Sequence, residues 1–176
     1  GLLFDDWMEA HLMNAYVVAA ALILYGVLFI VVENINYGKR PAIERVGDIT
    51  YKTALIIGLF QVLSLVPGTS RSGSTILGAM IIGCSRPAAA EFSFFLGIPV
   101  MFGASLLKLV KFGFHFTGLE LFYLIAGMVI AFVVSVYSIK FLMGYIRKNN
   151  FKVFGYYRIV LGVIVLFYFG VTAFLG

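Results

Sequence analysis

Long apolar runs separated by short polar segments make up the hydrophobic pattern of this chain. A single helix needs about 20 mostly apolar residues to cross a hydrocarbon core of about 30 Å. Four runs meet this length, and they predict membrane-spanning helices over 11–33, 88–110, 119–145 and 153–175. They lack the polar face that a helix on the surface of a soluble core would have. The pattern therefore predicts an all-α, multi-pass membrane protein with a transmembrane helix bundle.

A fifth apolar region, residues 50–84, is interrupted near its middle by Pro67-Gly68. The half before the break and the half-helix expected from Ser74 onward are each too short for a comfortable crossing. We therefore predict a re-entrant helical hairpin that enters and leaves the membrane on the same face. Irregular backbone at membrane depth is tolerated only inside protein or beside a cavity, so residues 67–75 are a candidate site.

The positive charges of the loops favour this topology. If residues 50–84 re-enter, Lys108 and Lys111 lie on one face and ten basic residues lie on the other. The richer face then carries Lys39, Arg40, Arg45, Lys52, Arg86, Lys140, Arg147, Lys148, Lys152 and Arg158. Cytoplasmic loops are rich in Lys and Arg, so this face is expected in the cytoplasm and both chain ends on the periplasmic side.

Composition agrees with a membrane protein. Of the 176 residues, 62% are hydrophobic and 12% are charged, whereas soluble domains have about 45–50% apolar and about 25% charged residues. The net charge of +5 comes from basic residues in short loops, so it indicates topology and not a nucleic-acid partner. The single cysteine excludes an internal disulfide.

The segment with most chemistry is 67–75, Pro-Gly-Thr-Ser-Arg-Ser-Gly-Ser-Thr. Arg71 is the only charged side chain across 53–85, and a charge inside a membrane segment costs roughly 2.5–3.5 kcal/mol. A guanidinium, several hydroxyls and the N-terminus of a half-helix together favour phosphate or a similar oxyanion. The predicted binding residues are Gly68, Thr69, Ser70, Arg71, Ser72, Gly73, Ser74 and Thr75.

A second interpretation needs no ligand. Gly, Ser and Thr often serve close packing between membrane helices, which explains the small residues but neither Arg71 nor the Pro-Gly break. No acidic cluster predicts a metal site, and we expect Glu91 to mark a helix start or pair with an Arg.

Other phosphatase chemistries fit poorly. No Gly-rich loop ends in Gly-Lys-Ser/Thr, as a nucleotide P-loop would. Cys84 lacks an Arg six residues on, and His11 and His115 are far from the motif in sequence.

Residues 58–75 resemble the second signature of the undecaprenyl-diphosphate phosphatases, the bacitracin-resistance family, and residues 86–94 are similar to the next stretch of that family's chain. The resemblance covers essentially the whole sequence as the C-terminal part of the family chain. The family's first signature, with glutamates, serines and a histidine, is absent. We therefore expect an N-terminal part of the same protein to be a partner and to supply the acid/base groups, and a second copy of the chain stays open as a partner.

The resemblance implies an enzyme of the bacterial inner membrane that converts the C55 isoprenoid diphosphate carrier to its monophosphate for peptidoglycan synthesis. It also implies an architecture of two inverted repeats, of which this chain is one, and a divalent cation, Mg²⁺ or Ca²⁺. The candidate catalytic residues are Arg71, Ser70 and Thr75. Arg71 would clamp the diphosphate and stabilise charge at phosphorus, with Ser70, Ser72 and Thr75 on phosphate oxygens. A serine nucleophile would lack a base in this chain, so attack by water is the favoured route.

Two other classes of function remain. A transporter or flippase of a phosphorylated lipid or anion can use the same broken-helix site. A purely structural subunit would need Arg71 only for folding.

Overall fold

Helices make up most of the part of the chain that is described. The computed structural model describes residues 12–113 and 117–175, and no strand is assigned among them. His11 and His115 lie outside these ranges.

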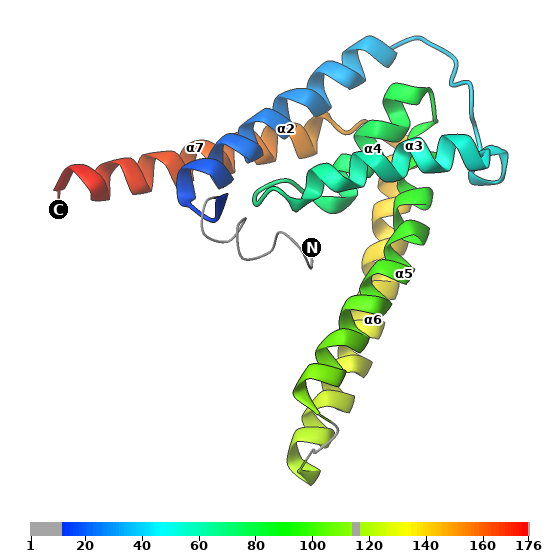
Figure 1. Ribbon diagram of the computed structural model, residues 1–176. Coiled ribbons are helices and arrows are strands. Elements are labelled where there is room, and N and C mark those ends of the chain that lie inside the picture. The colour runs from blue at the N-terminus through cyan, green and yellow to red at the C-terminus, as the bar shows by residue number, and fades with distance from the viewer. Residues whose placement is uncertain (1–11, 114–116, 176) are drawn as a thin grey trace.

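Four long helices occupy the regions predicted to span the membrane. They are α2 (Ala15–Asn36), α5 (Arg86–Phe112), α6 (Gly118–Lys148) and α7 (Lys152–Leu175) (Figure 1). Among the described residues, these four are long and apolar enough to cross a membrane. The chain is thus an all-α, multi-pass membrane protein.

Polar residues set the starts of the helices. Asn14, Ser85 and Thr117 each accept a hydrogen bond on the side-chain oxygen from the backbone N–H three residues on, which satisfies a donor that the first turn leaves unpaired. Pro87 occupies the first turn of α5, as predicted. The polar breaks in the hydrophobic pattern therefore coincide with capped helix ends.

Residues 50–84 fold as two short helices joined by a turn. The first is α3 (Tyr51–Val62), continued by the 3₁₀ turn η2 (Leu63–Leu65), and the second is α4 (Arg71–Ile82). Each α-helix has 12 residues and is therefore about 18 Å long, too short for a core of about 30 Å. The two arms pack closely because Phe60 of α3 lies against Gly78 of α4, where a Cβ would collide with the ring.

The hairpin begins and ends at one place. Beside its base, the Ala42 N–H donates to the Gly83 carbonyl (2.9 Å), and the Ser85 N–H donates to the Ile43 carbonyl (2.8 Å). At its tip, the Gly68 backbone lies against the Val18 backbone near the start of α2. The link before α3 therefore meets the chain that follows α4; that the hairpin re-enters a membrane stays a prediction.

The helices α2 and α7 form a tightly packed antiparallel pair. A Cβ on Gly155 would lie 2.7 Å from the Gly26 carbonyl oxygen, and one on Gly162 would lie 2.9 Å from the Ala19 carbonyl oxygen. Small residues let the backbones of membrane helices approach and gain van der Waals contact. This packing holds α7, and with it Arg158, at a set register on α2.

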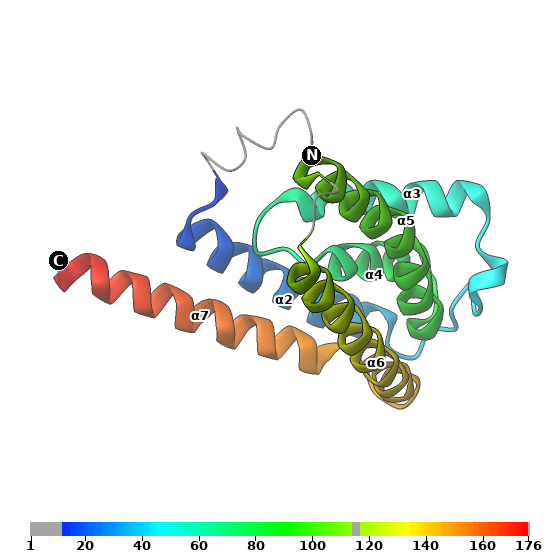
Figure 2. The same ribbon diagram turned by 90° about the horizontal axis from the view of Figure 1, so that it is seen from below.

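The second pair, α5 and α6, leaves the hairpin in another direction (Figures 1 and 2). This pair packs on the rest of the protein through α4. The buried residues Ala88, Ala89 and Ala90 of α5 lie against that helix. No residue in the most apolar 18-residue window of α6 is buried. The long helices therefore form two diverging pairs with the hairpin between them, and the apolar outer faces of α5 and α6 are open to lipid or to further protein.

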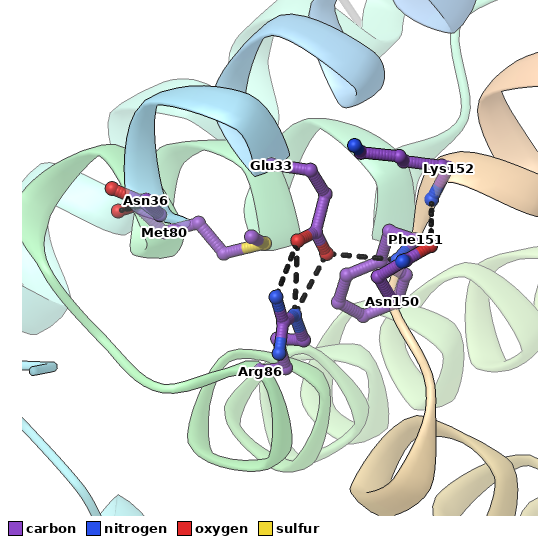
Figure 3. Close-up of polar contacts among 7 residues, drawn as sticks. All are labelled: Glu33, Asn36, Met80, Arg86, Asn150, Phe151 and Lys152. Carbon is purple, nitrogen blue, oxygen red and sulfur yellow. Dashed lines mark hydrogen bonds and ion pairs between the residues drawn. The ribbon is translucent and has the colours of Figure 1, made fainter. Parts of the chain in front are cut away.

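A buried carboxylate connects the base of the hairpin to both pairs. Glu33, at the end of α2, is 1% exposed and accepts two hydrogen bonds from Arg86 Nε and one from its Nη2, the last at 2.6 Å (Figure 3). It also accepts the Phe151 N–H at 2.8 Å, just before α7 begins. One side chain thus fixes the end of α2, the start of α5 and the start of α7.

We expect Gly155→Ala to destabilise the protein by about 1–3 kcal/mol, because the methyl group overpacks the contact with α2. The measurement is the thermal unfolding temperature of the purified protein in detergent. Gly170→Ala in the same helix is the control, since a Cβ there meets nothing within 4 Å. Equal unfolding temperatures for the two variants would contradict the packing described.

We expect Glu33→Gln to lower the free energy of unfolding by about 1–3 kcal/mol, the cost of a lost hydrogen bond to a charged group. The cost stays below that of a fully buried pair because the Arg86 side chain is 37% exposed. Thermal unfolding in detergent measures it, with the exposed Glu44→Gln as control. A loss no larger than that of the control would remove Glu33 as an anchor.

Candidate functional site

The N-terminus of α4 forms the tip of the hairpin. Ser70 caps it: its Oγ accepts the Gly73 N–H at 3.1 Å and lies 3.1 Å from Ser72 Oγ. Because of this cap, the helix begins at Arg71 and not at Ser74, where the sequence predicted it. Residues 71–75 therefore point in different directions around the first helical turns and do not line a single loop.

Beside this tip lies a cavity of about 290 Å³ whose lining is amphipathic. Its polar lining comes from Ser70, Ser72 and Arg158, and Gly73 of α4 lines it next to the Arg158 guanidinium. Its apolar lining includes the rings of Phe29, Phe94, Phe151, Phe154 and Tyr157. A mostly apolar cleft with a few convergent polar groups is the usual form of a small-molecule site.

Arg158 contacts the tip, although the sequence analysis counted it only among the basic residues of the cytoplasmic face. Its Nη2 donates to the Gly68 carbonyl at 3.1 Å, and its guanidinium carbon lies 5.8 Å from the centre of the Tyr25 ring, within cation–π range. The helix α7 begins at Lys152, so Arg158 lies nearly two turns inside it and not at its end; the membrane face of this end of α7 stays a prediction. The sequence could have identified Arg158 as a candidate by the argument made for Arg71, because it too is a charged residue inside an apolar run.

Arg71 faces away from this cavity and toward α5. Its guanidinium lies against Gly97, where a Cβ would overlap it. Its Nη1 is buried and makes no hydrogen bond to any described residue. A buried donor without a partner costs about 1–3 kcal/mol, so this nitrogen is an open position for an acceptor.

Two of the predicted hydroxyls hold the tip together. Thr75 is 1% exposed, its Oγ1 lies 2.6 Å from Ser93 Oγ of α5, and it donates to the Arg71 carbonyl at 3.1 Å. Ser74 is equally buried and donates to the Tyr25 hydroxyl of α2 at 3.0 Å. Both join α4 to its neighbours, and neither lines the cavity.

The turn before α4 is closed by its own residues. Thr69 Oγ1 donates to the Val66 carbonyl at 2.6 Å, and Gly68 has a φ of +89°, which favours glycine. The structure thus brings Ser70, Ser72 and Gly73 to the cavity, adds Arg158, and uses Gly68, Thr69, Ser74 and Thr75 to build the tip. Binding by these residues stays a prediction.

Other candidate residues lie elsewhere. Glu91 is in the second turn of α5, because that helix begins at Arg86, so the expected helix-start role is wrong; it lines a shallow hollow together with Arg147. Cys84 is buried at the base of the hairpin. No group of three or more His, Cys, Asp or Glu residues that could hold a metal ion lies within residues 12–113 and 117–175.

The chain is similar to known proteins over most of its length. Residues 1–164 match the family described as "Bacitracin resistance protein BacA". The chain is 61% identical, over its whole length, to an undecaprenyl-diphosphatase of Desulfitobacterium hafniense, and 63% identical, over 94% of its length, to one of Enterococcus faecalis. It spans 64% and 60% of the lengths of these two relatives. With this match over most of its residues, the chain belongs to the bacitracin resistance protein BacA family.

Proposed function

We propose that this protein hydrolyses undecaprenyl diphosphate to undecaprenyl phosphate and inorganic phosphate in the inner membrane of a bacterium. The reaction recycles the lipid carrier for cell-wall synthesis and gives resistance to bacitracin. Relatives about 60% identical to the chain carry the name undecaprenyl-diphosphatase, which supports this reaction. Both described chain ends, at residues 12 and 175, would lie on the periplasmic side.

The observation that carries the proposal is the amphipathic cavity at the hairpin tip. Its five aromatic side chains offer an apolar wall to isoprenoid units. Ser70, Ser72 and Arg158 offer hydroxyl and guanidinium donors to a diphosphate, and charge-assisted bonds from Arg to phosphate are among the strong ones. The α4 N-terminus adds a favourable dipole for an anion. One cavity thus holds groups suited to both ends of a lipid diphosphate.

Arg71 lies at the same tip on the side of α5 and does not line this cavity, so its part in the proposal requires the diphosphate to extend around the tip. Its unpaired Nη1 would gain a partner from a phosphate oxygen and would stabilise the charge that develops during transfer of the phosphoryl group. Ser70 would bind a phosphate oxygen directly. Thr75 would act as a positioning residue, because its bonds to Ser93 and to the Arg71 carbonyl hold the start of α4.

The group that activates water is not among the residues that line this cavity, none of which is His, Asp or Glu. We propose that an N-terminal segment supplies it, as the family resemblance implies, and a second copy of the chain stays open as a partner. A divalent cation remains part of the proposal through that resemblance alone. The described residues offer it no cluster of ligands, so we assign it no ligand and no step.

A transporter or flippase would use the same tip without hydrolysis. The names of the relatives favour the hydrolase. An assay in detergent distinguishes the two activities, because transport requires a membrane that separates two compartments and hydrolysis does not.

We expect the full-length protein in detergent to release phosphate from undecaprenyl diphosphate, and Arg158→Gln to slow the release about tenfold or more, the loss of one charge-assisted hydrogen bond. Phosphate is measured colorimetrically, with Lys152→Gln at the start of α7 as the control. Binding of the lipid without any release of phosphate would instead support a carrier. Turnover of Arg158→Gln equal to that of the control would remove Arg158 from the site.

We expect Arg71→Ala to lower the turnover at least about 10²-fold, as loss of a donor to transition-state charge does. Gly97→Ala should also slow it, because the new methyl group displaces the Arg71 guanidinium, and small misplacements of catalytic groups cost up to about 10²-fold. Gly103→Ala in the same helix is the control, since a Cβ there meets nothing within 4 Å. Near-native turnover of folded Arg71→Ala would remove the clamp.

A further inference from the structure

A second cavity lies at the other end of α4, at the base of the hairpin. Its volume is about 280 Å³, and its lining includes Met80 and Gly83 from the end of α4 and its cap. The start of α5, the end of α6 and the link that connects α2 to the hairpin complete it. The length of α4, about 18 Å, separates its Gly83 from Ser70, although Ile146 lines both cavities; the basic residues of this cavity are not among those that line the site proposed for the diphosphate.

Four basic side chains line this second cavity: Lys39, Arg40, Arg86 and Arg147. No Asp or Glu is among the residues that line it. Glu33, which does not line the cavity, neutralises the charge of Arg86 through an ion pair of 2.6 Å (Figure 3). Lys39 and Arg40 have no such compensation within the lining, and Arg147, which also lines a neighbouring hollow with Glu91, is a further cation, so the lining itself carries an excess of positive charge.

The fold itself brings these charges together. Lys39 and Arg40 belong to the link after α2, whereas Arg147 belongs to the last turn of α6. A preference for positive loops on one face of a membrane requires basic residues near the helix ends. It does not require three segments to place them around one hollow. The N-terminus of α5 also lines the cavity, and its helix dipole adds to the attraction for an anion.

Apart from Asn36 and Ser85, the rest of the lining is mostly apolar. Ala42, Met80 and Ile146 line the cavity beside the cations. The helices α2 and α6 end here and α5 begins here, each a candidate membrane span, so this cavity would lie at the level of the lipid headgroups. A cationic hollow with apolar walls at this level suits a phosphate attached to acyl chains.

We propose that this cavity binds the phosphate group of an anionic ligand, with an anionic phospholipid headgroup as one source and free inorganic phosphate as the other. Basic pockets between membrane helices bind such headgroups through the same electrostatic attraction. The proposal concerns binding alone and does not depend on hydrolysis at the hairpin tip.

The test is native mass spectrometry of the full-length protein mixed with equal amounts of phosphatidylglycerol and phosphatidylcholine, without isoprenoid diphosphate. The wild type should retain phosphatidylglycerol preferentially. Arg40→Gln should lower its retention about fivefold, and Arg40→Gln with Arg147→Gln about 25-fold, from about 1 kcal/mol per basic residue. Lys52→Gln, an equal charge change on an exposed side chain that does not line the cavity, is the control and should retain it fully.

An excess of inorganic phosphate then distinguishes the two sources. Displacement of phosphatidylglycerol by phosphate supports a site for the phosphate group alone, and resistance to displacement supports a site for the lipid headgroup. Equal retention of the two lipids by the wild type overturns the proposal. Undiminished retention of phosphatidylglycerol by the folded double variant also overturns it.

Discussion

The arrangement of this protein depends on one buried carboxylate. Glu33 binds Arg86 through a forked ion pair and also accepts the Phe151 N–H, so the ends of three helices are fixed at one point. Taking a charge out of water is costly unless it is paired and fully hydrogen-bonded, and Glu33 meets both conditions. Because Arg86 follows the hairpin directly, the same interaction ties the end of the hairpin to the end of α2.

Polar side chains gather at both ends of α4, the helix whose C-terminus reaches the base of the hairpin. Its N-terminus presents Ser70 and Ser72 beside Arg158, next to an aromatic wall. Its C-terminus ends in a hollow lined by Arg40 and Arg147, among other basic residues. As proposed, the two cavities would bind phosphate groups in different ways: the first combines hydroxyls, a guanidinium and a helix N-terminus, and the second gathers cations from the link after α2 and from the ends of α5 and α6.

The small polar residues of the tip have two separable tasks. Ser70 and Ser72 line the cavity, whereas Ser74 and Thr75 are buried and bond to Tyr25 and Ser93 on neighbouring helices. Helix packing and the lining of the cavity are therefore divided among the faces of one helix. Successive helical residues point about 100° apart, which is why neighbours in sequence take different tasks.

The amino-acid sequence alone determined where the four long helices lie, that a short hairpin follows the first of them, and which segment forms its tip. The length of the hydrophobic runs and the Pro-Gly break were enough for this. These features are local: they follow from how many apolar residues stand in a row and from which residues interrupt a helix. Tertiary structure alone decided that Glu33 pairs with Arg86, that Arg71 turns toward Gly97, and that Arg158 reaches Gly68. Those contacts join residues far apart in the chain, and they depend on the register of packed helices, which hydrophobic patterns do not encode.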